Sequence, residues 1–417
     1  MKNLKVVFSS DWHLGLKTEE IDRTDEIIEI GKDIVNHCIS LMEEDHRVIL
    51  VFGGDMFNVN YPSEYHISRF IEVLNLVRKY KIECYIMVGN HDSIPDPDRS
   101  SCMSFVNKIR VAYPTIRLID DIRFLNVGNN DIGPIYFTFL PHITKALVHK
   151  KIKDGKYEGD TNPQKYIDSK SMRILKKLGK EEVTHYAFSH LNVIGAHPGS
   201  EENLLKKSEV YLPECFVEPP FGYSYVQPTI IQAHIHSHSV EGKLNIVGSP
   251  IYCTFGESGP KYFCEISINH CLGHADEIEF IPTKHRPFMQ LELDMMGETK
   301  DFFEIEEVAK FLASVKEANK PVVKFDLTID PEHNNYDWKK IREKVMEECD
   351  AVVKPILPRV VMKRTIRSVK QKIDLPIKDK LKVYLKKNMN GDLPRAKRIY
   401  KRAQKYIGDE NGNAKTR

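Results

Sequence analysis

The amino-acid sequence predicts an α/β fold: a four-layer αββα sandwich, then a small α+β domain and a helical tail. In the first part of the chain, short apolar segments alternate with segments of helical periodicity, which is typical of parallel βαβ units. Shorter apolar segments follow from about residue 134 and predict a second sheet packed on the first. Polar clusters stand directly after several of these segments, where an α/β sheet presents its chemistry.

The first sheet is predicted from three apolar segments and two helical ones. The helical segments place isoleucine, leucine or valine every three or four residues, as in Ile27, Ile30 and Ile34. In chain order the expected elements are a strand at 5–9, a helix at about 24–43, a strand at 48–52, a helix at about 63–80 and a strand at 84–88.

The second sheet is predicted from four shorter apolar segments. A charged stretch, Lys150 to Asn162, has little apolar content and is expected to be an exposed loop. The expected elements are strands at 135–139, 185–188, 228–231 and 244–247, with a helix at about 163–179.

Two or three domains are expected from the length, because 417 residues exceed the size of one ordinary hydrophobic core. We place them at 1–282, 283–366 and 367–417. The middle domain is predicted to hold strands at 289–293 and 322–328 and helices at about 304–318 and 336–348. It has no ligand-like cluster, which favours a role as a specificity or cap domain. The last domain is expected to form two basic amphipathic helices separated by Asn388–Asp392.

The charge is distributed unevenly along the chain, with a basic segment at its carboxyl-terminal end. Residues 367–417 hold 16 Lys and Arg against 5 Asp and Glu, a net of +11, so the rest of the chain carries −9 of the total +2. A basic tail on an acidic body indicates a polyanion or an acidic protein as partner, although a solvated charged helix would look the same.

The eight cysteines are scattered singly, which predicts reduced thiols. No apolar run is long enough to span a membrane and no signal-peptide pattern is present, so a cytoplasmic or nucleoid-associated location is expected.

Five clusters of polar residues predict a metal centre. They are Asp11-Trp12-His13, Gly54-Asp55, Gly89-Asn90-His91-Asp92, Ser189-His190 and His234-Ile235-His236. Their mixture of carboxylate, amide and imidazole groups suits a pair of divalent cations such as Mn²⁺, with Mg²⁺ as the alternative, better than structural zinc.

The types and spacing of these residues suggest a separate role for each of them at the metal centre. Asp11 and His13 lie two residues apart, so both side chains point to the same side of an extended segment and can hold one metal together. Asp55 follows two glycines and can bridge two cations roughly 3.5–4 Å apart. His91 is more useful as a proton donor than as a ligand. Asn90, His190, His234 and His236 complete the candidate ligand set.

In this order the five clusters resemble the calcineurin-like metallophosphoesterase superfamily, and within it the Mre11/SbcD nucleases. Gly248-Ser249-Pro250 and Phe255-Gly256-Glu257 add to the nuclease resemblance. Two positions depart from the family pattern, since Asn58 replaces the usual His or Asp and Ala233 replaces the usual Gly. The resemblance covers residues 1 to about 260; for the rest it is one of domain order.

The resemblance implies roles for single residues. One metal would be held by Asp11, His13, Asp55 and His236, and the other by Asp55, Asn90, His190 and His234. His91 would protonate the leaving oxygen or stabilise the transition state, with Asp92 to orient it.

The resemblance also implies a function and partners. It implies a Mn²⁺-dependent DNA nuclease, exonucleolytic on double strands and endonucleolytic on single strands, that works in DNA end processing, repair or recombination. A cap domain would recognise DNA, the tail would bind a Rad50/SbcC-like ATPase, and the protein would form a homodimer.

Two alternatives remain at the level of sequence. One is a phosphatase or small phosphodiesterase of the same superfamily, although Asn58-Val59-Asn60 stands where protein phosphatases typically carry a DRG element. The other is a non-catalytic DNA-binding scaffold, which the complete set of candidate ligands disfavours. ATP hydrolysis by this chain is not expected, because the sequence contains no GxxxxGK[ST] motif.

Overall fold

The computed structural model describes most of the first 361 residues. The described residues are 3–19, 21–96, 101–129, 133–179, 183–194, 210–218, 227–257, 259–268, 276–298, 300–331, 336–361, 399 and 401. The chain divides into two compact units, Met1–Val360 and Val361–Arg417. The domain boundaries at 282 and 366 therefore stay predictions, and the predicted helical tail lies outside the described residues except at Ile399 and Lys401.

The first sheet has six strands in the order β14-β13-β1-β4-β5-β6. The strands β1, β4, β5 and β6 run parallel, which confirms the predicted βαβ units. Three strands of this sheet were not predicted: β6, which pairs parallel with β5, and β13 and β14, which extend the sheet antiparallel on the other side of β1. The bounds are β1 Leu4–Ser9, β4 Arg47–Phe52, β5 Glu83–Met87, β6 Ile116–Ile119, β13 Tyr262–Ile268 and β14 Glu277–Pro282.

The second sheet also has six strands, in the order β11-β12-β10-β9-β8-β7. Its four inner strands are parallel, and the edge strands β7 and β11 are antiparallel to their neighbours. All four predicted strands are confirmed. The bounds are β7 Arg123–Asn126, β8 Ile135–Leu140, β9 Thr184–Ser189, β10 Thr229–Gln232, β11 Ser239–Glu241 and β12 Leu244–Ile246.

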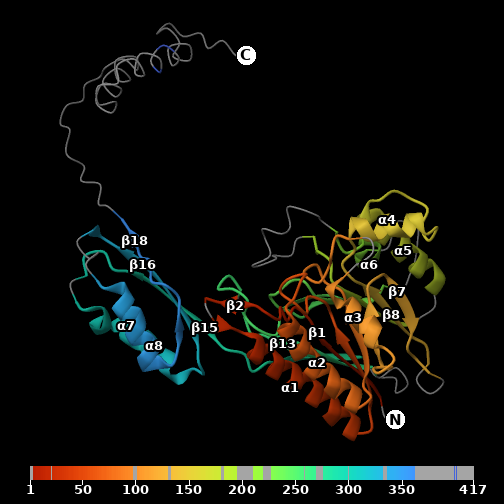
Figure 1. Cartoon of the computed structure of the whole chain (residues 1–417), viewed down its shortest axis with the longest axis horizontal. Coiled ribbons are helices and arrows are strands. Elements are labelled where there is room, and N and C mark those ends of the chain that lie inside the picture. The colour runs from red at the N-terminus through yellow and green to blue at the C-terminus, as the bar shows by residue number, and fades with distance from the viewer. Residues whose placement is uncertain are drawn as a thin grey trace. The chain divides into compact units, whose positions relative to one another are not determined.

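The two sheets pack face to face, with helices on both outer faces (Figure 1). A buried aromatic cluster that includes Phe8, Phe137 and Phe188 joins the sheets. Helices α1 and α2 cover the first sheet, and α4, α5 and α6 cover the second. The α/β sandwich is thus confirmed. The helix bounds are α1 Thr24–Glu43, α2 Glu64–Lys79, α3 Phe105–Ile109, α4 Lys145–Lys153, α5 Pro163–Leu178 and α6 Glu214–Val217.

The predicted loop at Lys150–Asn162 is wrong at its start, because α4 continues to Lys153. The Thr144 hydroxyl accepts a hydrogen bond from the backbone N–H of Leu147 at 3.2 Å and so caps this helix. Leu147 and Val148 bury its apolar side against the second sheet. The helix was not predicted because it is short and the lysines on its exposed side make the sequence look like a charged loop.

A third sheet of four strands contains β15, β16, β17 and β18, with helices α7 and α8 packed on it. It has a hydrophobic cluster of its own, which includes Phe302, Phe325 and Val345. The predicted strands and helices of this region are confirmed. The bounds are β15 Phe288–Asp294, α7 Glu306–Glu317, β16 Val322–Ile329, α8 Trp338–Cys349, β17 Val352–Val353 and β18 Arg359–Val360.

Among the described residues, no helix is both long and apolar enough to cross a membrane.

The unpredicted strand β13 is tied to β1 and α1 by one carboxylate, and this yields a testable prediction. Glu265 accepts from Lys5 Nζ at 2.6 Å and lies 2.8 Å from His37 Nε2. The hydrogen bond from His37, with that from Lys5, outweighs burial and lowers the pKa of Glu265 from 4.5 to about 2. A depressed carboxyl pKa stabilises the fold above the unfolded-state value, and this stabilisation is lost as pH falls from about 4.5 to about 2.

We therefore expect the wild type to lose about 3 kcal/mol of unfolding free energy through this group over that pH range. The variant Glu265→Gln should lack this part of the pH dependence. Urea denaturation at a series of pH values measures it, with Glu241→Gln, an exposed position on β11, as the control. Equal acid sensitivity in Glu265→Gln and the wild type would contradict the assignment.

Candidate metal centre

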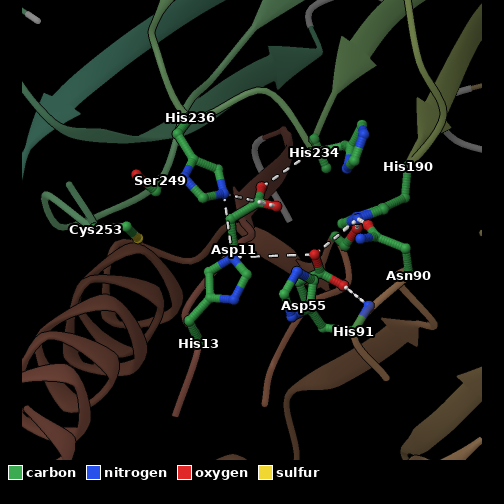
Figure 2. Close-up of polar contacts among 12 residues, drawn as sticks. Asp11, His13, Asp55, Asn90, His91, His190, His234, His236, Ser249 and Cys253 are labelled. Carbon is green, nitrogen blue, oxygen red and sulfur yellow. Dashed lines mark hydrogen bonds and ion pairs between the residues drawn. The ribbon is translucent and has the colours of Figure 1, made fainter. Parts of the chain in front are cut away.

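The five predicted clusters meet at the carboxyl ends of strands from both sheets (Figure 2). Asp11 and His13 follow β1, Asp55 follows β4, and Asn90 and His91 follow β5. From the second sheet, His190 follows β9, while His234 and His236 follow β10. Asn90 and His91 are partly exposed, and the other predicted site residues are buried. The parallel strands of two packed sheets thus bring residues separated by more than 200 positions to one place.

The backbone at the site is held in an unusual conformation. Asp11, His13, Asp55 and His234 have φ values of 58°, 51°, 53° and 71°, in the left-handed region that non-glycine residues rarely adopt. Hydrogen bonds from Asp11 N to Gly54 O at 2.9 Å and from His13 N to Asp55 O at 3.0 Å lock the first two loops together. Such strain persists where the surrounding structure enforces it, and it concentrates at functional sites.

One half of the site contains Asp11, His13 and His236. The Nε2 atoms of His13 and His236 lie 3.1 Å apart, and Asp11 Oδ1 lies 4.0 Å from His236 Nε2. Asp11 Oδ2 accepts a hydrogen bond from His234 N at 3.0 Å, whereas its Oδ1 has no hydrogen-bond partner among the described residues. A buried carboxylate oxygen without a donor is costly unless a cation satisfies it.

The other half contains Asn90, His190 and His234. His190 Nε2 lies 3.0 Å from Asn90 Oδ1 and 3.3 Å from Asp55 Oδ2. His190 Nδ1 donates to the carbonyl of Gly53 at 2.8 Å, which directs Nε2 at the site, where it can bind a cation once it has lost its proton.

His234 presents its other ring nitrogen. Its Nε2 lies 2.9 Å from Asn192 Oδ1, and its buried Nδ1 has no hydrogen-bond partner in the described part of the chain. A ring whose Nε2 donates to an amide oxygen keeps a lone pair on Nδ1, so we predict that His234 would bind metal through Nδ1.

Asp55 lies between the two halves. Its Oδ2 is 3.3 Å from His190 Nε2 and 4.0 Å from His13 Nε2, so one carboxylate reaches both sides. Although burial alone would raise its pKa, the charges of His190 and His91 hold the pKa of Asp55 well below its usual range. Despite its own burial, His190 has its pKa raised to about 9, chiefly by Asp55. A site that keeps a buried carboxylate ionised and stabilises a positive ring favours cations.

The residues present therefore fit two divalent cations. The closely grouped donors include Asp55, His190 and His234 in one set and His13, Asp55 and His91 in another, and Asp55 is common to both. The buried oxygen of Asp11 and the buried Nδ1 of His234 supply acceptors that protein donors leave unused.

Two hydrogen bonds to the loop after β4 fix the position of His91. Its Nδ1 lies 2.8 Å from the carbonyl oxygen of Asn58, to which it must donate, and its own N–H donates to Asp55 Oδ1 at 2.8 Å. The ring of His91 lies edge-on to that of His13, with centroids 4.7 Å apart.

The Asn58 carbonyl makes an orienting contact with His91 that was not predicted, and the orienting role of Asp92 stays a prediction. The Asp92 carboxylate accepts from three backbone N–H groups, those of Met56, Phe57 and Gly89, at 3.3, 3.1 and 3.0 Å. It thus fixes the loop after β4 against the loop after β5. Sequence could not separate these roles, because a backbone carbonyl leaves no trace in a side-chain pattern.

Supporting residues behind His236 were also missed. Glu257 Oε1 lies 3.2 Å from His236 Nδ1 and orients the ring. Lys261 Nζ bonds to Glu257 and also donates to Ser249 Oγ at 3.0 Å and the carbonyl of His236 at 2.9 Å. Although burial would raise it, the pKa of Glu257 is lowered to about 2 by His236 and Lys261. The motif Phe255-Gly256-Glu257 pointed to this segment only through the family resemblance.

Removing Lys261 is expected to destabilise the fold. Lys261 is 1% exposed and Glu257 is 7% exposed, so Lys261→Met would leave a buried carboxylate without the ammonium group that pairs with it. The expected loss in urea denaturation is about 3 kcal/mol. The control, Lys310→Met, breaks an exposed pair with Glu306 and should cost no more than about 1 kcal/mol. Equal losses of unfolding free energy in the two variants would show that the buried pair stabilises the fold no more than the exposed one.

Comparison with known proteins gives the following matches. The model of the family described as calcineurin-like phosphoesterase matches residues 4–239. Among solved structures, a dimetal phosphatase from Danio rerio is matched at 11% identity with a TM-score of 0.37, covering 67% of this chain and 96% of that one. This second likeness is too low to transfer a substrate.

Proposed function

The chain belongs to the calcineurin-like phosphoesterase family, and from this premise we propose that it is a two-metal nuclease that hydrolyses the phosphodiester bonds of DNA. The observation that carries the hydrolytic part is the position of Asp55, whose carboxylate reaches donors of both halves of the site. Family membership indicates a metal-dependent phosphoester hydrolase. Cleavage of DNA is the finer part of the proposal.

The proposed ligands are Asp11, His13, Asp55 and His236 for one cation, and Asp55, Asn90, His190 and His234 for the other. Bound divalent cations supply Lewis-acid polarisation of a phosphate and a nucleophile at neutral pH. Oxygen and imidazole donors together suit Mn²⁺, with Mg²⁺ as the alternative.

The chain's own residues position the proton donor. The Asn58 carbonyl accepts from Nδ1–H of His91, which fixes the ring and leaves Nε2 as the nitrogen that, when protonated, can donate to a leaving oxygen. Asp55 accepts a hydrogen bond from His91 N–H, so this one contact positions both His91 and the central carboxylate.

Two sequence segments support DNA as the substrate. Gly248-Ser249-Pro250 and Phe255-Gly256-Glu257 carry the nuclease resemblance, and both contribute to the support of His236, through Ser249 and Glu257. The basic tail at 367–417 suits DNA or a protein partner.

Full-length protein with Mn²⁺, assayed on end-labelled duplex DNA, on single-stranded DNA and on p-nitrophenyl phosphate, tests the proposal. We expect cleavage of DNA and weak turnover of the monoester. Strong monoester turnover without DNA cleavage would instead support a phosphatase, and binding of DNA without any hydrolysis would support a scaffold.

The tail is proposed to bind a Rad50/SbcC-like ATPase. Deleting residues 367–417 should preserve metal-dependent cleavage but abolish co-purification with a co-expressed ATPase of that class. A truncated chain that still co-purifies would reassign the tail to DNA, in which case a weakened salt dependence of DNA binding should follow. The homodimer is proposed on the resemblance alone, and light scattering of the purified chain tests it.

A further inference from the structure

A thiol lies beside one half of the metal centre. Cys253 belongs to the loop between β12 and β13 and is partly buried. Its sulfur and one ring nitrogen from each of His13 and His236 all lie within 4.8 Å of one another. Figure 2 shows Cys253 next to His236 and Ser249, on the side of the site away from His190. None of the roles derived above uses this thiol.

The thiol is held in place by the residue that orients His236. Glu257 accepts hydrogen bonds from the backbone N–H groups of Cys253 at 3.2 Å and Thr254 at 3.1 Å, while its Oε1 also lies 3.2 Å from His236 Nδ1. One buried carboxylate therefore fixes both the loop that carries the sulfur and the imidazole ring facing it. Two donors are positioned by a single support.

The two imidazole nitrogens are close enough to share one cation. In a tetrahedral zinc site, bond lengths of about 2.0–2.1 Å place two imidazole nitrogens roughly 3.3 Å apart. The observed separation of the Nε2 atoms of His13 and His236 is 3.1 Å. The Cys253 sulfur lies within 4.8 Å of a ring nitrogen of each histidine and is the third donor of this group.

We propose that His13, His236 and Cys253 bind a thiophilic divalent cation of the zinc class. Thiolate and imidazole favour Zn²⁺ and Co²⁺ over Mn²⁺, which prefers oxygen donors. On binding, the thiol releases its proton to solvent. A cation bound by these three residues uses His13 and His236, which are two of the ligands proposed for the first catalytic cation. Zinc at this position therefore competes with that cation and inhibits hydrolysis.

Cobalt provides a direct readout, because a thiolate bound to Co²⁺ gives a charge-transfer absorption in the near ultraviolet. Full-length protein titrated with Co²⁺ should show this band, saturating at one equivalent. The band should be absent in Cys253→Ser and retained in Cys102→Ser, a thiol of similar exposure outside the donor set. Zn²⁺ affinity should fall at least about tenfold in Cys253→Ser while Mn²⁺ affinity is unchanged.

A second measurement avoids substitution. In the wild type, Zn²⁺ should slow alkylation of Cys253, read by mass spectrometry, at least tenfold, and Mn²⁺ should not. Bound cobalt without the charge-transfer band, the band in Cys253→Ser, or alkylation indifferent to zinc would each overturn the inference. The site shares His13 and His236 with the proposed phosphoesterase centre and its inhibitory role rests on that proposed function, yet the tests are separable. Manganese-dependent hydrolysis without the cobalt band would contradict the thiolate site but support the proposed function. The band without hydrolysis would support the thiolate site but contradict the proposed function.

Discussion

Asp55→Asn is expected to abolish metal-dependent hydrolysis, with a fall in turnover on the order of 10³-fold or more. Removing a single electrostatic contact to a reacting group costs roughly 10²–10³-fold in turnover, and Asp55 serves both halves of the site. The substitution keeps the shape of the side chain but removes the charge that faces His13 and His190. Metal content measured by mass spectrometry should fall together with activity.

The control is Asp25→Asn, at an exposed carboxylate that pairs with Arg69 on the surface. It should leave both activity and metal content at the wild-type level. Full metal content in Asp55→Asn with activity lost would mean that Asp55 acts on substrate rather than as a ligand. Full activity in Asp55→Asn would remove the basis of the two-metal proposal.

Much of the fold could be predicted because strand and helix periodicity are local properties. Strands β1, β4 and β5 are buried on both faces and read as continuous apolar runs. Strand β13 was missed although it pairs with β1 over five residues. Its partner lies more than 250 positions away, and Glu265 interrupts its apolar run. That glutamate is tolerated there because Lys5 and His37 neutralise it, which no local pattern reveals.

The candidate site divides in the same way. Side chains with metal-ligand chemistry at strand ends were found from their types and spacing, and the structure brings all of them together. What was missed acts through contacts that form only after folding. The Asn58 carbonyl is backbone, Asn192 is an ordinary loop amide, and Cys253 and Glu257 lie in a loop that follows a different strand. Residue type does not identify any of these as part of the site.

His91→Gln is expected to lower turnover by about 10²–10⁴-fold, the usual contribution of a general acid. Metal content should stay at the wild-type level, since His91 is proposed as a proton donor and not as a ligand. Glutamine preserves approximate size and polarity but cannot deliver a proton. The control His149→Gln changes an exposed histidine on α4 and should have no effect.

The leaving group decides which role His91 plays. If it protonates the leaving oxygen, His91→Gln should cost far less on a p-nitrophenyl phosphodiester, whose leaving group needs no proton, than on DNA. If it stabilises charge in the transition state, both substrates should lose equally. Proton donation also predicts that the alkaline limb of the pH–rate profile disappears in the variant. A parallel loss of metal, as large as in Asp55→Asn, would make His91 a ligand, which its place in a group with His13 and Asp55 would then explain.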